Sequence, residues 1–370
     1  MISLAVNSYM EDAIISQLHA STGNRDTKIR YELLNYNNIK IGEVSAISGK
    51  VGLNSLAEIK RTGSFTLKDS DTKDIDWLND RIRPVFCLRM PDSGFAEWSL
   101  GIFLLSSPRR QEINLKIQRD VEAYGQSLIL REDKYDTRYR IVAGSKYTTA
   151  ITGIINSAGI SRVNLPDHPG TLAVDKEFEI GTPKLIAINE LLAAINYSSL
   201  WVDESGYFVA QPYKLPSERE SEYAYKNDRF SVIHNGAAED VDLFNVPNKW
   251  VVVASNPENE PLVGRYINNN PASMTSTYNR HRVITDYREV KDIFDQETLD
   301  NYTKRIAYNA SDIYGTLEFT TALMPHHSFL DCLFVEHTDL GVSAKYIETS
   351  WEMDLTAGIM RHSARRVIHI

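Results

Sequence analysis

Residues 113–123 have the sequence Ile-Asn-Leu-Lys-Ile-Gln-Arg-Asp-Val-Glu-Ala, the clearest structural signal in the chain. Only Arg119 breaks a series in which apolar residues occupy every second position, namely Ile113, Leu115, Ile117, Val121 and Ala123. In a β-strand, alternate side chains point to opposite faces. The pattern therefore predicts one long antiparallel strand over 113–123 with one face in water.

Shorter strand candidates precede this stretch. Gly63–Leu67 and Leu100–Leu105 are apolar runs separated by turn-rich segments. Tyrosine outnumbers phenylalanine, 19 to 12, as expected where half-buried strands dominate. We expect residues 29–135 to form a small β-barrel or sandwich. A polar arm, 1–28, precedes it and is expected to become ordered on the body of the protein or on a partner.

The period changes to that of helices in residues 136–228. Lys146–Ala158 carries isoleucines on one helical face and ends before Gly159. A second helix is expected to begin with Thr182 as N-cap and Pro183 at its first position. Its apolar stripe would be Leu185, Ile188, Leu192 and Ile195. Two apolar runs around the turn 203–206 predict a hairpin, so this block is mixed α/β.

Residues 229–370 return to strand patterns, with expected strands over 230–233, 249–254, 317–323 and 347–355 and a final basic strand through Arg361–Arg366. One inserted helix is predicted over 295–312, with the apolar stripe Leu299, Tyr302, Ile306, Ala310 and Ile313. The predicted fold class is α+β, predominantly antiparallel β, in which two β blocks flank a mixed α/β block.

The composition excludes several classes of protein. The chain has 370 residues and a formal net charge of −9, which opposes general binding to nucleic acid. No apolar run reaches the length of a membrane-spanning helix, so we expect no stable membrane span. The first residues lack the basic start of a secretory signal, and none is expected. Cys87 and Cys332 lie in apolar contexts and are expected to be buried free thiols.

The sequence contains no strong catalytic motif, and we predict no catalytic, cofactor-binding or metal-binding residues and no cofactor. His326, His327, His337 and His362 could assemble a metal site, but adjacent histidines on a strand face opposite ways, and surface or turn histidines are favoured. The acidic run 69–76 departs from the spacing of a calcium loop and fits a solvated turn better.

Other polar features have equally ordinary interpretations. The carboxylate pairs Asp240 with Asp242 and Glu348 with Glu352 could serve acid–base chemistry, but they are also what the wet face of a strand supplies. Basic pairs and clusters fit solvated strand ends; they are Arg109–Arg110, Arg280–Arg282 and Arg361–Arg366. The tryptophans are spread over all blocks, which favours core anchors over a carbohydrate platform; they are Trp77, Trp98, Trp201, Trp250 and Trp351.

Several segments resemble bacteriophage tail-tip and baseplate hub proteins. The segments are 58–67 (EIKRTGSFTL), 75–84 (IDWLNDRIRP), 98–108 (WSLGIFLLSSP) and the helix–hairpin 191–208 (LLAAINYSSLWVDESGYF). The order of a helix at 295–312, Met324-Pro325, an alternating strand and a basic end is also similar. The resemblance covers most of the chain from about residue 31 onward, and it rests on packing and turn patterns.

The resemblance implies a structural virion protein, not an enzyme, that is assembled in the cytoplasm of a host bacterium. In this family two tail-tube-like β-barrels per chain pack around a trimer axis, so a homotrimer can join a sixfold tube to a threefold tip. The expected division is an arm (1–28), a first barrel (29–135), an α/β helix–hairpin domain (136–228) and a second barrel with one inserted helix (229–370). A lysin extension, which many relatives carry, is not expected.

The implied partners are a tail-tube or distal tail protein ring, the tape-measure protein and a central spike or fibre. DNA would pass the channel transiently during genome ejection after host attachment, and acidic side chains are expected to line it. Two other functions stay open from the residues alone. The chain could be a tail-associated cell-wall hydrolase, or it could be a carbohydrate-binding tail module with exposed aromatics on one face.

Overall fold

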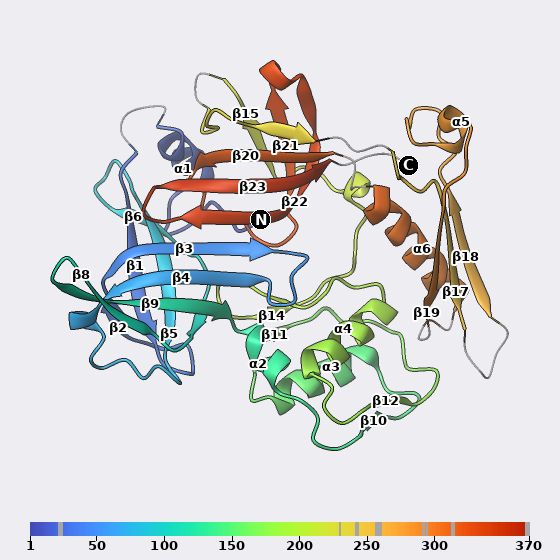
Figure 1. The fold of residues 1–370 in the computed structure, drawn as a ribbon, viewed down its shortest axis with the longest axis horizontal. Helices are drawn as coiled ribbons and strands as arrows, with labels where there is room; N and C mark the ends of the chain where they lie inside the picture. Colours follow the sequence, from blue (N-terminus) through green and yellow to red (C-terminus); the bar gives the residue numbers. More distant parts are fainter. Residues whose placement is uncertain are drawn as a thin grey trace.

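The computed structural model describes residues 1–20, 25–228, 231–240, 244–255, 261–290, 293, 295–311 and 315–366. The chain is 41% strand and 18% helix, and most strand pairs are antiparallel (Figure 1). The predicted fold class, α+β with predominantly antiparallel strands, is therefore confirmed.

One large sheet of fifteen strands contains both β blocks of the chain. From the first block come β1 (Thr27–Leu34), β2 (Lys40–Val44), β3 (Ala46–Asn54), β4 (Arg61–Lys68), β5 (Arg81–Arg89), β6 (Phe95–Ser99), β7 (Phe103–Leu105), β8 (Arg109–Ile113) and β9 (Lys116–Gly125). From the last come β16 (Ala238–Asp240), β20 (Thr316–Ala322), β21 (Cys332–His337), β22 (Val342–Asp354) and β23 (Ile359–Arg366), and β15 (Tyr223–Lys226), at the end of the middle block, joins the same sheet.

The two blocks meet where β3 pairs antiparallel with β22. Gly52 lies opposite Glu352 in this pair, and a Cβ at Gly52 would come within 3.0 Å of the Trp351 carbonyl oxygen. A glycine therefore permits the close approach of the two strands. Among the described strands, the pairings do not close either block into a separate barrel; instead they join the blocks edge to edge.

The stretch 113–123 is not one strand. Its first residue ends β8, and β9 begins at Lys116, so the alternating pattern crosses a hairpin. Asn114 and Leu115 form the turn with φ of 50° and 60°, the left-handed values required at both central positions of a type I′ turn. Ile113 pairs with Lys116 and Glu112 with Ile117, so Ile113 and Ile117 lie on opposite faces of the hairpin. In the sequence, however, apolar residues recur at every second position straight through the turn, and the pattern therefore concealed it.

The middle block has its own apolar core beside the large sheet (Figure 1). Its elements are β10 (Tyr139–Ile141), α3 (Tyr147–Ser157), β11 (Val163–Asn164), β12 (Lys176–Phe178), α4 (Lys184–Ala194), β13 (Trp201–Val202) and β14 (Phe208–Val209). The helix α2 (Ser127–Glu132), at the end of the predicted first block, contributes Leu130 to the same core. Both predicted helices and the hairpin are confirmed, and the stripe of α4 is buried. The predicted cap is wrong by one residue, because Pro183 and not Thr182 is the N-cap of α4.

A second small unit is inserted between β16 and β20. A three-stranded sheet of β17 (Lys249–Ala254), β18 (Leu262–Ile267) and β19 (Thr285–Val290) packs against α6 (Gln296–Ser311), and α5 (Thr277–Arg280) precedes β19. The predicted helix is confirmed, with Leu299, Ile306 and Ala310 buried. The expected stripe residue Ile313 and the end at residue 312 lie outside the described residues.

The amino-terminal segment contains α1 (Glu11–Leu18) and packs on the body of the protein. Leu4, Ile14 and Leu18 are buried in the same core cluster as the large sheet. The Ile2 amide donates a hydrogen bond to the His326 carbonyl oxygen at 2.8 Å. Cys87 and Cys332 are buried and free, as predicted. Within the described residues, no helix combines the length and apolar character needed to cross a membrane.

Candidate functional site

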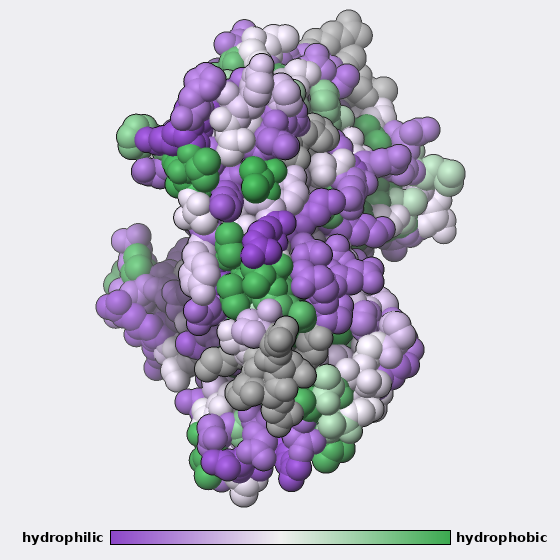
Figure 2. Space-filling view, turned by 90° about the vertical axis from the view of Figure 1, so that its right-hand side faces the viewer, coloured by the Kyte–Doolittle hydropathy of each residue, from purple (hydrophilic) through white to green (hydrophobic). Residues whose placement is uncertain are grey.

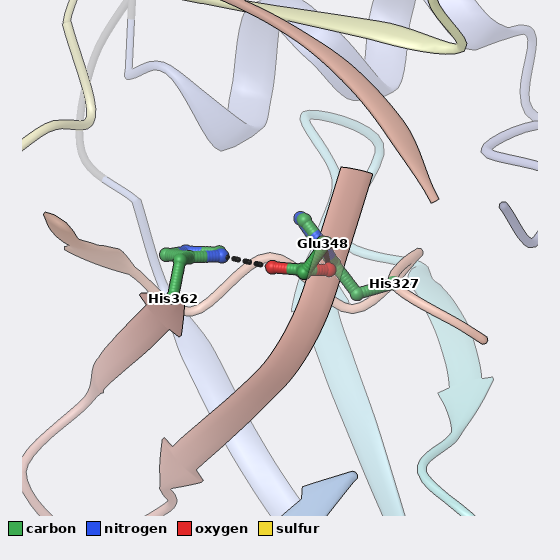
Figure 3. Close-up of side chains that lie close together, drawn as sticks. All are labelled: His327, Glu348 and His362. Carbon is green, nitrogen blue, oxygen red and sulfur yellow. Dashed lines mark hydrogen bonds and ion pairs between the residues drawn. The ribbon is translucent and has the colours of Figure 1, made fainter. Parts of the chain in front are cut away.

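A cluster of buried titratable side chains lies inside the carboxyl-terminal block. His327 comes from the loop between β20 and β21, Glu348 from β22 and His362 from β23 (Figure 3). Their side chains are fully shielded from solvent. These histidines were predicted to lie at the surface or in turns. The predicted exposure is wrong, because His326, His327 and His362 are all buried.

Glu348 bridges the two histidines. Its Oε2 lies 2.5 Å from Nδ1 of His327 and its Oε1 lies 2.6 Å from Nδ1 of His362. The second nitrogen of each ring also has a partner, since Tyr225 Oη is 2.6 Å from Nε2 of His327 and Thr321 Oγ1 is 2.8 Å from Nε2 of His362. The cluster is therefore a hydrogen-bonded chain that joins β15, β20, β22, β23 and the 323–331 loop.

The partners determine where most protons lie. Within the described residues the Tyr225 hydroxyl reaches no acceptor except Nε2 of His327, so it donates there and Nδ1–H of His327 donates to Glu348. The Thr321 hydroxyl donates to the Ala322 carbonyl oxygen, so Nε2–H of His362 donates to Thr321. One proton is then shared between Nδ1 of His362 and Oε1 of Glu348.

Burial determines the direction of each pKa in this cluster. Burial raises the pKa of Glu348 to about 7, although His362 acts in the opposite sense. Burial lowers the pKa of His327 to about 4 and also lowers the pKa of His362. All three shifts favour the uncharged forms, as expected where water is excluded. The shared proton therefore resides mainly on the carboxyl group.

A β-bulge explains why Glu348 lies inside. The pairing of β22 with β23 shifts register between Glu348 and Ser350, so Thr349 is an extra residue. The expected alternation placed Ile347 and Thr349 on the same face as Trp351 and Met353. Because the bulge shifts the alternation by one residue, Glu348 lies on the same core face as Trp351. The interpretation of Glu348 as part of a wet strand face is therefore wrong.

A second buried polar group adjoins the cluster. Asp331 Oδ2 lies 3.8 Å from Nδ1 of His327, and Asp331 Oδ1 forms an ion pair with the Met1 amino group at 2.9 Å. Glu222 also contacts that amino group at 2.9 Å. Burial alone would lower the pKa of the amino group, but the two carboxylates raise it overall. His326 is buried beside His327, with ring centroids 4.9 Å apart, and burial holds its pKa well below the usual range.

His327, Glu348 and His362 are also the residues that could hold a metal ion, since their ligand atoms lie within 4.8 Å of one another. Ligand atoms on a tetrahedral zinc ion are separated by about 3.3 Å, because each bond is about 2.0–2.1 Å long. The oxygen–nitrogen distances of 2.5 and 2.6 Å are those of direct hydrogen bonds. The geometry therefore fits a proton-sharing network better than a metal cage.

A shallow groove of about 430 Å³ crosses the outward face of the large sheet above the β3–β22 junction. Small and polar side chains line much of it, including Gly52, Asn54, Thr320, Ser350, Glu352, Arg361 and Ser363. Arg361 and Glu352 form an ion pair at 2.9 Å across β22 and β23. This pair neutralises two of the charges in the groove, and Glu318, which also lines it, adds a further carboxylate.

The remaining sequence candidates do not form a common site among the described residues. The acidic run 69–76 forms an exposed turn, and Asp69 pairs with Arg110 and Arg119 at 3.0 and 2.7 Å. Asp240 is exposed on β16, and Asp242 lies outside the described residues. Arg280 and Arg282 donate to backbone carbonyl oxygens near Phe244.

Four of the five tryptophans are buried, as the core interpretation predicted; they are Trp98, Trp201, Trp250 and Trp351, while Trp77 is half-buried. Arg119 lies over the ring of Trp77 at 5.5 Å, so this ring is also partly covered by its own chain. The tryptophans therefore do not supply a flat exposed platform for a sugar.

Comparison with solved structures finds similar folds in phage tail proteins. A tail protein from Neisseria meningitidis MC58 matches with a TM-score of 0.67 and 11% identity, over 92% of this chain and 97% of that one. The 43 kDa tail protein of prophage MuSo2 from Shewanella oneidensis matches with 0.65 and 10% identity, over 92% and 98%. The prophage tail protein gp18 from Listeria monocytogenes EGD-e matches with 0.57 and 12%, over 91% and 94%.

Comparison with protein-family models and with curated protein sequences finds no match. At such low identity, the structural likeness shows a shared fold and nothing about individual residues. It nevertheless includes the middle block and the inserted unit, because more than nine tenths of each chain is superposed.

Proposed function

We propose that this chain is a structural protein of a phage or phage-like tail and forms the hub of its tip or baseplate. The observation that carries the proposal is the likeness to two tail proteins over almost their whole length. A shared fold alone is weak evidence of function. The support is stronger here because the likeness covers more than nine tenths of each chain, and so includes the two β blocks joined in one sheet and the α/β units attached to them.

In this proposal three chains form a ring. Each chain contributes the blocks 29–135 and 229–370, so that three chains present six similar β units to a sixfold tube while the tip keeps threefold symmetry. The α/β block 136–228 faces a central spike or fibre, and the arm 1–28 stays on the body. The continuous β3–β22 pairing supports this arrangement, because it holds the two blocks of one chain in a fixed relation.

The proposed partners are the tail-tube or distal tail ring, the tape-measure protein and the spike or fibre. The hub would close the channel in the resting particle and let DNA pass during ejection. The net charge of −9 supports a channel wall that repels DNA. A bore lined mainly by arginine and lysine in the assembled ring would contradict this part of the proposal.

We also propose that the protein is not an enzyme. The most enclosed titratable groups, His327, Glu348 and His362, are fully buried and use their ring nitrogens and carboxylate oxygens in mutual hydrogen bonds. A general acid or base must reach the substrate, and these atoms cannot do so without opening the core. The groove above the sheet supplies one neutralised ion pair, the carboxylate of Glu318 and small polar groups.

The experiment that tests the proposal combines location and mass. Antibody labelling of tail particles in the electron microscope is expected to mark the tip, and the purified chain is expected to have three times the monomer mass of 42.0 kDa in light scattering. A label along the tube, or none on the particle, would contradict the hub. Release of cell-wall fragments by the purified chain would favour the hydrolase alternative.

A further inference from the structure

The β8–β9 hairpin extends beyond the sheet to which it belongs. β8 pairs only with β9 among the described strands, and the pairing of β4 with β9 begins only at Gln118. Residues 113–117 therefore have no strand beside them except within the hairpin itself. Figure 1 shows the hairpin at the left end of the molecule, pointing away from the body.

The tip of this hairpin is apolar and exposed. Leu115 is 92% exposed, and Ile113 and Ile117 on either side of the turn are 45% and 44% exposed. Single exposed apolar residues are common on protein surfaces. Here Ile113 and Ile117 lie on opposite faces of the hairpin and Leu115 lies at its end, so the projecting tip is apolar at its end and carries an apolar side chain on each face.

The backbone at the tip is also unfavourable for the residue it carries. Leu115 has φ of 60°, in the left-handed region where a leucine side chain crowds its own backbone. Glycine is the usual residue at the second central position of such a turn. Leu115 therefore adopts a strained conformation without burying its side chain in its own chain.

The charge of the hairpin indicates the kind of surface it fits. Residues 109–118 contain Arg109, Arg110 and Lys116 against Glu112, a net charge of +2, so the rest of the chain carries −11. Arg110 is paired with Asp69, but Arg109 and Lys116 are exposed beside the apolar tip. Long-range attraction therefore directs this hairpin toward an acidic protein, and another copy of this chain is one.

We propose that the tip of the β8–β9 hairpin packs against an acidic surface of a second copy of this chain. The inference rests on the proposed self-assembling hub and names one of its contacts. A tip that projects from one end of a subunit meets a different surface on its neighbour, and such a head-to-tail contact closes into a ring when it repeats. The burial of Leu115 in the neighbour compensates for its strained backbone.

The test compares three variants of the full chain by light scattering and sedimentation over a range of concentrations. Leu115→Ser removes the apolar tip, and Leu115→Gly also removes the backbone strain. Leu56→Ser is the matched control, because Leu56 is 66% exposed in the turn between β3 and β4. Melting temperatures show whether each variant folds.

Both Leu115 variants are expected to weaken self-association by at least about tenfold, as loss of an interface hot spot does. Leu115→Gly is expected to melt at the same or a higher temperature than the parent protein, so reduced assembly cannot reflect misfolding. Leu56→Ser is expected to assemble normally.

Two results would overturn the inference, and they are distinguishable. If the parent protein assembles and both Leu115 variants assemble equally well, the hairpin contact is wrong while the hub proposal stands; binding of the tip to a different tail protein would give this result. If the parent protein stays monomeric at all concentrations, the self-assembling hub fails and the contact fails with it.

Discussion

At the scale of single residues, Glu348 has an unusual position, because one buried carboxyl group serves two histidines from different segments. Its two oxygens contact Nδ1 of His327 and Nδ1 of His362, and no water reaches the group. Removing a shared partner leaves buried polar groups unsatisfied, which costs more than the bonds themselves contribute. The network therefore stabilises the core only while it is complete.

Glu348→Ala is expected to lower the free energy of unfolding by about 3 kcal/mol, because both histidines lose a partner in the core. Glu352→Ala is the control on the same strand, since Glu352 is only half-buried and its ion pairs with Arg361 and Lys50 lie at the surface. The control should change stability by less than about 1 kcal/mol. Urea unfolding measures both, and equal effects would show that the network does not stabilise the protein.

The pH dependence of stability follows from the same cluster. The pKa of His327 is about 4 in the folded protein against 6.5 for a free histidine, and burial lowers the pKa of His326 and His362 in the same direction. Stability from these groups is fully present above pH 6.5 and is lost as the pH falls toward 4, because the unfolded chain takes up protons first.

Glu348 acts in the opposite sense. Its pKa is raised from 4.5 to about 7, so its contribution is present at low pH and is lost as the pH rises through 7. Three histidines outweigh one carboxyl group, and stability is expected to fall as the pH decreases from about 6.5 toward 4. His327→Asn should flatten this slope in urea unfolding, and His281→Asn, at an exposed histidine, should not.

At the scale of elements, the close packing of α6 on its sheet depends on a glycine in β18. A Cβ at Gly264 would overlap the Thr303 hydroxyl and lie 3.2 Å from Leu299 Cγ. Thr303 in turn donates to the Leu299 carbonyl oxygen inside α6 at 2.7 Å. The helix can therefore lie directly on the strand only where no side chain intervenes.

Gly264→Ala is expected to destabilise the inserted unit by about 2 kcal/mol, because the helix must move away from the sheet. Gly153→Ala is the control in α3, where a Cβ would meet nothing within 4 Å. An alanine at this exposed helix position should instead raise the free energy of unfolding by about 0.5–1 kcal/mol. Thermal unfolding of both variants tests the contrast, and a neutral Gly264→Ala would mean that the helix packs less closely.

The elements differ in how well a local pattern describes them. The helices α3, α4 and α6 were predictable because their apolar stripes and end signals lie within one segment. The hairpin turn at Asn114 and the bulge at Thr349 were not, because the apolar residues recur at every second position straight through the turn and a bulge has no residue signature. The bulge concealed Glu348 as well, since it reverses which face the preceding residues occupy.

At the scale of the whole molecule, the junction of β3 and β22 makes the two β blocks one structure. Their side chains share a single core, from Leu53 and Phe65 in the first block to Trp351 and Met353 in the last. The inserted unit, by contrast, has a small core of its own around Trp250 and Leu299. We therefore expect the inserted unit to open more easily than the shared core of the two β blocks.

Amide hydrogen exchange of the native protein tests this division. Amides in β3 and β22 are expected to exchange together, at the slowest rate, because opening either strand opens the shared sheet. Amides in β17, β18 and β19 are expected to exchange earlier and as a separate group. Faster exchange of β3 than of β22 would show that the two blocks open independently despite their pairing.

The sequence by itself determined the local features: strand-rich blocks around an α/β segment, the apolar stripes of the helices, the buried thiols and the tryptophan anchors. These depend on periodicity, which neighbouring residues impose on one another. Only the tertiary structure decided that the blocks share one sheet, that α1 packs on the body and that His327, Glu348 and His362 meet in the core. Such contacts join residues far apart in the chain, and their formation depends on strand pairing and a single bulge that no local pattern encodes.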